Sequence, residues 1–190
     1  PAGALWTNAT KQELALMLGN EKPSSVSQVE LFGTQYTKEV YSAKTLYFNA
    51  NGQLAIIEVT NKAAQESLAK AVDAYKKAAA IDPKAKGLAE AFENINQKYI
   101  GDAYSAYQLG NYAQGSQLFE QAAAAANNAP LNKVDSLSIY NAGFLAQTAG
   151  DNARAKKFFQ QCMNMGYYSN EGELFARLAE VDPDNTKNYL

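Results

Sequence analysis

The sequence predicts an all-α chain built from helical hairpins that stack in a row. Two stretches, GNYAQGSQLFEQA at 110–122 and GDNARAKKFFQQC at 150–162, repeat a glycine, an aromatic and a small residue at an interval of 40 residues. Apolar residues in both stretches follow the spacing i, i+3, i+4, i+7, which places them on one face of an α-helix. Each opening glycine precedes Asn111 or Asp151, and this combination is typical of the end of one helix and the cap of the next.

Composition excludes several function classes. The 190 residues carry a formal charge of −2 with 19% charged side chains and no clustered basic stripe, so nucleic acid is not an expected partner. The longest apolar runs are short, as at Ala122–Ala126, and fall far below the roughly 20 residues that span a bilayer. We therefore expect no transmembrane segment.

Residues 1–30 are predicted to form an N-terminal segment with one short helix. The stretch KQELALMLG at 11–19 has the spacing of a short amphipathic helix. The stretch NEKPSSVS at 20–27 follows as its exit turn, because Pro and Ser are common in turns.

Residues 39–60 have two interpretations. In the first, 39–49 form a helix that ends near Gly52 and is followed by an insertion. In the second, 46–48 and 54–59 are strands joined at NANG, since both are rich in aromatic and β-branched residues. We favour the helix because the helix predicted to follow it needs an antiparallel partner.

That following helix spans 61–80, and its apolar stripe comprises Ala71, Ala74, Tyr75 and Ala78. One aromatic residue lies between small residues, so a neighbouring helix can approach closely around a single large side chain. The prediction is a first helical pair over 31–83 with an insertion near 50–60.

Residues 84–190 are predicted to contain further hairpins of the same kind. The second helices repeat the stripe as Gly115, Leu118, Phe119 and Ala122, and as Ala155, Phe158, Phe159 and Cys162. The first helices carry stripes of Ile100, Ala103, Tyr104 and Tyr107, and of Ile139, Ala142, Gly143 and Ala146. Because one such unit cannot bury its apolar face alone, stability comes from stacking on the next.

These hairpins resemble the tetratricopeptide repeat, in which small residues, a turn glycine and an aromatic residue hold fixed places. The matching residues are Gly143, Ala146, Gly150, Ala155, Phe159 and Cys162 in the later copy, and Ala103, Ala106, Gly110, Tyr112, Gly115, Phe119 and Ala122 in the earlier one. The closing proline of the family appears as Pro83. The resemblance covers roughly residue 62 onward, is closest to bacterial members with long, irregular repeats, and implies a right-handed superhelix of about three repeats plus a partial fourth.

Two features depart from the family pattern. The interval of 40 residues exceeds the usual period of about 34, and the polar stretch NNAPLNKVD at 127–135 accounts for the excess as a longer connection. Residues 171–180 are predicted to form the first helix of a fourth unit, and DPDN at 182–185 the turn that follows. We expect this last repeat to be incomplete.

The sequence offers little for catalysis, so we expect no catalytic residue, no cofactor and no metal. Histidine, the commonest acid–base residue near neutral pH, is absent. The single cysteine, Cys162, occupies a place where the repeat needs a small packing residue. Asp182 and Asp184 lack the glycine and terminal glutamate of a calcium loop.

The resemblance implies instead a partner-binding concave face lined by the first helices. The residues that the repeat frame places there are Ile100, Tyr104, Tyr107, Tyr140, Asn141 and Phe144, with Gln97 and Leu137 beside them. Aromatic side chains provide contact area at low entropic cost, and Asn can pair with a peptide backbone. Packing of the same residues between units, which would leave no groove, is the alternative. Of the basic clamp that grips chaperone tails in some members, only Asn141 is present.

These patterns predict a non-catalytic scaffold that binds a peptide or protein segment. The alternatives are an assembly component of a bacterial envelope complex, and the accessory repeat region of a larger enzyme or carbohydrate-binding protein. The 17 Asn, 13 Gln and 12 Tyr, with Pro1 in place of a starting Met, suit a periplasmic or otherwise exported bacterial protein. A cytoplasmic scaffold is the other possibility, and the oligomeric state is open.

Overall fold

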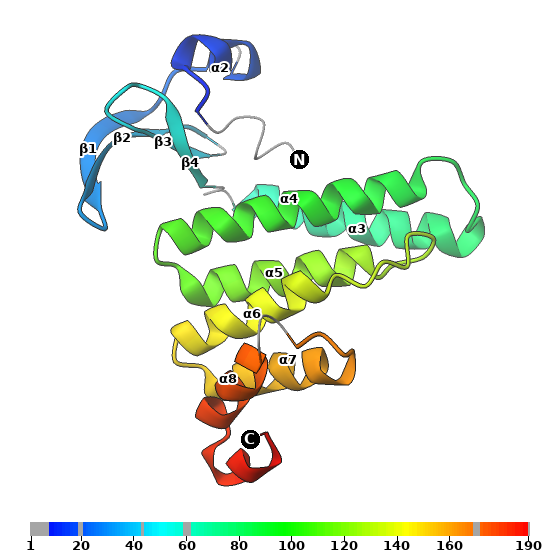
Figure 1. Cartoon of the computed structure of the whole chain (residues 1–190). Helices are drawn as coiled ribbons and strands as arrows, with labels where there is room; N and C mark the ends of the chain where they lie inside the picture. The colour runs from blue at the N-terminus through cyan, green and yellow to red at the C-terminus, as the bar shows by residue number, and fades with distance from the viewer. Residues whose placement is uncertain (1–7, 19–20, 43, 59–61, 169–171, 190) are drawn as a thin grey trace.

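A computed structural model describes residues 8–18, 21–42, 44–58, 62–168 and 172–189, and it has two regions (Figure 1). The N-terminal region is an antiparallel sheet with a short helix, α2, on one face. The second region is a row of helices that runs from α3 and α4 to α8. The sheet lies beside the end of α4 at which the chain turns into α5.

Among the described residues, four strands form a simple meander in the order β1-β2-β3-β4. With α2, the elements of this region are α2 Lys11–Leu18, β1 Ser25–Leu31, β2 Thr34–Val40, β3 Thr45–Phe48 and β4 Leu54–Glu58. Phe32 and Gly33 join β1 to β2, and both have positive φ, at 51° and 79°. Positive φ at both central residues is what a tight type I′ hairpin turn requires.

The all-α prediction is therefore wrong, and so is the helix predicted over residues 39–49. This segment contains the end of β2 and all of β3, and β3 pairs with β4 from Thr45↔Glu58 to Phe48↔Leu54. The second interpretation, two strands joined at NANG, is correct. Alternation explains why: Leu46 and Phe48 point to the face that α2 covers. The intervening Tyr47 points to the opposite face.

The predicted first helical pair over 31–83 is also wrong, because its first half forms strands. The helix that follows the sheet packs against α4 instead. The helices of this region are α3 Lys62–Ile81, α4 Leu88–Gln108, α5 Tyr112–Ala126, α6 Ser136–Thr148, α7 Asn152–Asn164 and α8 Glu173–Val181. The helices predicted for 11–19, 61–80 and 171–180 thus correspond to α2, α3 and α8.

Glycine ends α4 and α6 as the sequence predicts, with φ of 77° at Gly110 and 83° at Gly150. The caps that follow differ. The Asp151 carboxylate accepts a hydrogen bond from the backbone N–H of Arg154 at 3.0 Å and caps α7. The Asn111 side chain makes no such bond at the start of α5, so its predicted capping role is wrong.

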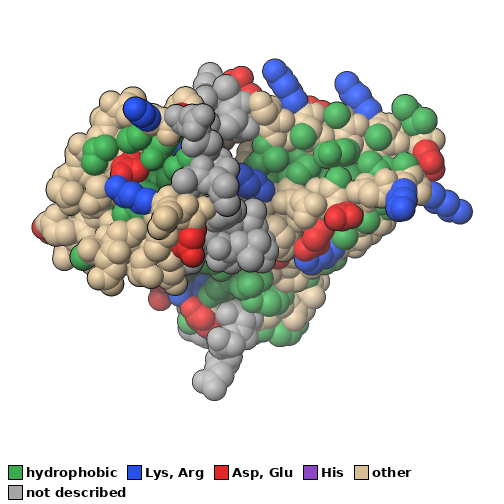
Figure 2. All heavy atoms as spheres, turned by 90° about the horizontal axis from the view of Figure 1, so that it is seen from above, with side chains coloured by type: hydrophobic (Ala, Val, Ile, Leu, Met, Phe, Trp, Pro, Cys, Tyr) green, Lys and Arg blue, Asp and Glu red, His purple; other side chains and the backbone are tan. Residues whose placement is uncertain are grey.

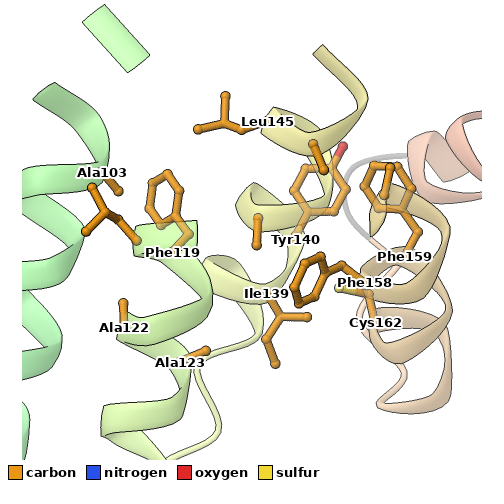
Figure 3. Close-up of a cluster of buried hydrophobic side chains, with 14 of the residues drawn as sticks. Ala103, Phe119, Ala122, Ala123, Ile139, Tyr140, Leu145, Phe158, Phe159 and Cys162 are labelled. Carbon is orange, nitrogen blue, oxygen red and sulfur yellow. The ribbon is translucent and has the colours of Figure 1, made fainter. Parts of the chain in front are cut away.

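The core of the helical region consists of bulky side chains that nest against small ones (Figure 3). Phe119 of α5 and Phe159 of α7 are 2% and 0% exposed. A Cβ added at Gly143 of α6 would lie 2.8 Å from Cε1 of Phe159. A larger residue there would press against the ring, which explains why small and aromatic residues keep their places along the repeat while others vary.

The N-terminal region has a smaller core and a polar bond inside it. Its buried apolar cluster comprises Leu14, Tyr41, Leu46, Phe48 and Leu54. The carboxylate of Glu39 is buried beside this cluster, where it accepts a hydrogen bond from the Tyr41 hydroxyl at 2.7 Å and forms an ion pair with Lys11. Glu39 therefore links α2 to the sheet.

After α8, residues Pro183–Asn188 form a 3₁₀ helix, where the sequence predicts a turn at DPDN. Asp182 precedes this segment, and its carboxylate accepts bonds from Lys156 at 2.9 Å and from the Tyr189 hydroxyl at 2.7 Å. Hydrogen bonds from Lys156, Tyr189 and Asn185 lower the pKa of Asp182 to about 2. This carboxylate ties the end of the chain to α7.

Candidate functional site

The structure separates the six predicted site residues into an open group and a covered group. Tyr104 and Tyr107, one helical turn apart on α4, are 48% and 44% exposed. Ile100 is half-buried against the helical core, and Asn141 of α6 is half-buried as well. Of the six predicted residues, the exposed aromatic ones are therefore both on α4.

Tyr140 and Phe144 of α6 are covered by α8. Tyr140 is buried, and the Nε of Arg177 donates a hydrogen bond to its hydroxyl at 2.9 Å. The guanidinium carbon of Arg177 lies 4.6 Å from the ring centroid of Phe144, in a cation–π contact. The ring of Tyr140 also packs on Phe159, with centroids 5.7 Å apart. Tyr140 and Phe144 therefore pack between helices, which is the alternative to lining a groove.

Tyr107 is part of a cleft between the sheet and the α4–α5 turn, with a volume of about 270 Å³. We call it the tyrosine cleft, and its lining residues are Leu31, Phe32, Thr34, Tyr36, Ile56, Tyr107, Gln108 and Tyr112. All eight side chains are uncharged. Its volume is close to the lower end of the range for small-ligand sites, about 300 Å³.

Sheet geometry positions one wall of the tyrosine cleft. Leu31 and Thr34 are paired across the β1–β2 hairpin, so both point to the same face of the sheet. Tyr36 follows two residues later on that face. Phe32 projects from the hairpin turn and is 71% exposed. A Cβ added at Gly110 would lie 3.1 Å from Cζ of Phe32, so this glycine leaves room for the ring as well as ending α4.

Two tyrosines from the helices form the opposite wall. The rings of Tyr107 and Tyr112 have centroids 5.9 Å apart and are tilted by 47°. Tyr104, beside them on α4, meets Phe119 edge to face at 5.3 Å and leaves its other side to solvent. Tyrosine hydroxyls and the Gln108 amide supply hydrogen-bonding groups along an otherwise apolar surface. Such a surface fits an uncharged, extended ligand.

Sequence reasoning missed the sheet side of this cleft. The stretch LFGT at 31–34 contains part of the signal, because a glycine between two alternating segments indicates a turn. A hairpin at this turn would have placed Phe32 at an exposed tip. It would not have placed the tip beside Tyr107, since this contact joins residues that are far apart in the chain.

The described residues contain no group of three or more His, Cys, Asp or Glu side chains placed to hold a metal ion. Burial raises the pKa of the Cys162 thiol to about 12, so the thiolate is scarce near neutral pH. Within the same residues, no helix combines the length and the apolarity needed to cross a membrane.

Comparisons with known proteins identify no neighbour: no family model, no curated protein and no solved structure matches the chain.

Proposed function

We propose that this protein is a non-catalytic interaction scaffold that binds an extended peptide or protein segment in the tyrosine cleft and along Tyr104. One observation carries the proposal: exposed aromatic side chains from the sheet and from α4 converge on one uncharged cleft. The resemblance to tetratricopeptide repeats predicts Tyr104 and Tyr107 as partner-binding residues. The sheet adds Phe32 and Tyr36 to that surface.

Physical chemistry favours a polypeptide segment as the ligand. Aromatic rings supply large contact areas with few rotatable bonds, so ordering them on binding costs little entropy. Tyrosine hydroxyls and the Gln108 amide can pair with the carbonyl and N–H groups that an extended backbone exposes. The lining contains no charge, so a strongly acidic or basic segment gains nothing from it.

The resemblance to tetratricopeptide repeats supports the same function, because partners of that family commonly bind along the first helices of the repeats. The first helix α4 contributes Tyr104 and Tyr107 to the proposed surface. Tyr140 and Phe144, covered by α8, are not part of it.

Selection of extended peptides from a random display library on the full chain tests the proposal. A selected peptide should lose about 30-fold or more in affinity for Tyr107→Ala, since central aromatic side chains at interfaces are often worth about 2 kcal/mol or more. Thermal melting should stay near that of the parent, because Tyr107 lies at the surface and is 44% exposed.

The matched control is Tyr168→Ala, which removes a tyrosine that is 47% exposed and lies outside the cleft. It should leave peptide affinity unchanged. Equal losses in both variants, or undiminished binding by Tyr107→Ala, would show that the cleft is not the binding surface.

A second candidate function, as an assembly component, is favoured by strand β1. It is one of the two edge strands of the sheet, and its residues SVSQVEL include neither Pro nor Lys, the residues that most often protect such edges. Strand pairing between copies through β1 would give a mass that rises with concentration in light scattering. A constant monomer mass would exclude it.

A further inference from the structure

The three second helices carry the same stripe but differ in how far it is covered. Phe119 of α5 and Phe159 of α7 are almost fully buried, whereas Tyr75, the corresponding residue of α3, is 38% exposed. The flanking small residues follow the same division. Ala122 and Cys162 are fully buried, but Ala78 of α3 is only half-buried.

The first helix of each hairpin covers the stripe of α5 and of α7. A Cβ added at Gly115 of α5 would lie 3.4 Å from the Ala103 carbonyl oxygen and 3.7 Å from the Ala106 Cβ, both on α4. At Gly143 of α6 the added Cβ would meet the ring of Phe159 on α7. In both hairpins a helix with small residues approaches closely around the aromatic side chain.

Among the described residues, no first helix of this kind precedes α3, because residues 25–58 form the sheet. An open groove of about 410 Å³ lies between α3 and α4 instead. Its lining residues are Leu68, Ala71, Tyr75, Gly87, Glu90, Ala91, Asn94, Ile95 and Lys98. Figure 2 looks down on this side of the molecule and shows apolar side chains gathered over the helices.

We infer that this groove binds an amphipathic helix of a partner protein, placed as the missing first helix of α3. The occupant lies antiparallel to α3 and parallel to α4, as α4 does to α5 and α6, and it presents small residues to Tyr75. Its binding surface is separate from the tyrosine cleft, so the inference does not depend on the function proposed above.

The charge at one end of the groove matches a helix in this orientation. Glu90 lies in the first turn of α4 and is exposed, whereas Lys98, eight residues further on, is paired with Asp102. A helix parallel to α4 places its positive N-terminal end near Glu90. Between Gly87 and Lys98 the groove accommodates about 17 Å, or three turns of helix at about 1.5 Å per residue.

Fluorescence anisotropy with the full chain tests this inference. The probe is a labelled peptide of residues 135–149, which copies the first helix α6 and its Gly143 and Ala146. A side-chain cross-link on its solvent face holds it helical, so the entropy of ordering does not weaken binding. Saturable binding is expected.

Two substitutions locate the binding. Ala71→Glu places a carboxylate in the groove and should weaken peptide binding about tenfold or more, because that charge loses water when the helix binds. Glu90→Lys changes an exposed residue and should weaken binding about two- to fivefold through the helix dipole. The control is Ala69→Glu, the same change at an exposed position outside the groove lining, which should have no effect.

Three results would overturn the inference. They are absence of saturable binding up to about 1 mM peptide, equal weakening by Ala69→Glu and Ala71→Glu, and unchanged binding by both Ala71→Glu and Glu90→Lys. Sedimentation of the chain without peptide gives a further check. A dimer that Ala71→Glu dissociates would assign the groove to a second copy of this chain instead.

Discussion

The helical hairpins α4–α7 and the N-terminal sheet with α2 both bury aromatic side chains, but different forces hold them together. In the hairpins, Phe119 and Phe159 pack among alanines and glycines, and helices approach closely at Gly115 and Gly143. In the sheet region, the buried carboxylate of Glu39 holds together side chains from α2 and from the end of β2. The stability of the helical hairpins therefore depends on the complementary shapes of their side chains. That of the sheet region depends partly on whether Tyr41 keeps the proton that it donates to Glu39.

The difference follows from how much surface each element can cover. A helix of 13 to 15 residues, such as α7 or α5, covers its neighbour along the whole crossing. Helix α2 has eight residues and covers part of one sheet face. With less apolar area removed from water, polar bonds provide a larger share of the stability of the sheet region.

The largest expected effect comes from emptying the helical core. Phe159→Ala should lower the free energy of unfolding by about 3–5 kcal/mol, because the residue is fully buried and its neighbours cannot fill the cavity. Calorimetry should show a midpoint lower by several degrees. Phe32→Ala, the same change at a ring that is 71% exposed, should alter stability by no more than about 0.5 kcal/mol.

Similar midpoints for these two variants would contradict the comparison, since the central helices would then not depend on nested side chains.

A smaller effect tests the close approach itself. In Gly143→Ala the new Cβ would lie 2.8 Å and 2.9 Å from ring atoms of Phe159, which overpacks the core at a cost of about 1–3 kcal/mol. Alanine is favoured over glycine in a helix by about 1 kcal/mol, so the net change is destabilising by up to about 2 kcal/mol. Denaturant unfolding measures the difference.

Gly115→Ala sharpens this second test. Its added Cβ would meet the end of the Leu145 side chain at 2.7 Å, and this aliphatic side chain, although buried, adjusts more easily than the rigid ring of Phe159. The variant should therefore lose less stability than Gly143→Ala. A more stable Gly143→Ala protein would show that helix propensity outweighs the contact with Phe159.

The two regions also differ in how well the sequence predicts them. The turns at Gly110 and Gly150 and the burial of Phe119 and Phe159 follow from local spacing, because helix periodicity and helix crossings act over short stretches. The apolar residues 46–48 are compatible with either a helix or a strand. Pairing with β2 and cover from α2, both distant in sequence, decide between the two.

The candidate site shows the same limit. The exposure of Tyr104 and Tyr107 was predictable from the helical frame. Tyr140 occupies the same kind of position on α6, but Arg177, 37 residues later, covers it. Phe32 joins the site across 75 positions of the chain from Tyr107. Contacts between residues so far apart in the chain cannot be predicted from a local sequence pattern.

The smallest expected effect tests whether protonation matters in the sheet region. Tyr41→Phe removes the hydroxyl that donates to Glu39 and should cost about 0.5–1.5 kcal/mol near neutral pH. Burial, with a smaller contribution from the Glu39 carboxylate, raises the pKa of Tyr41 well above its usual value of about 10. The unfolded chain therefore releases this proton first, so the contribution is complete below about pH 10 and is lost as pH rises through the raised pKa.

Urea unfolding at pH values below and above the ordinary tyrosine pKa measures this contribution. The parent should lose more stability than Tyr41→Phe as the pH rises, so the gap between the two proteins narrows. Tyr36→Phe, a change on the opposite face of the same sheet, is the control and should follow the parent. Parallel losses in the parent and Tyr41→Phe would mean that apolar packing, rather than the Glu39–Tyr41 bond, holds the sheet region together, and the contrast with the helical hairpins would disappear.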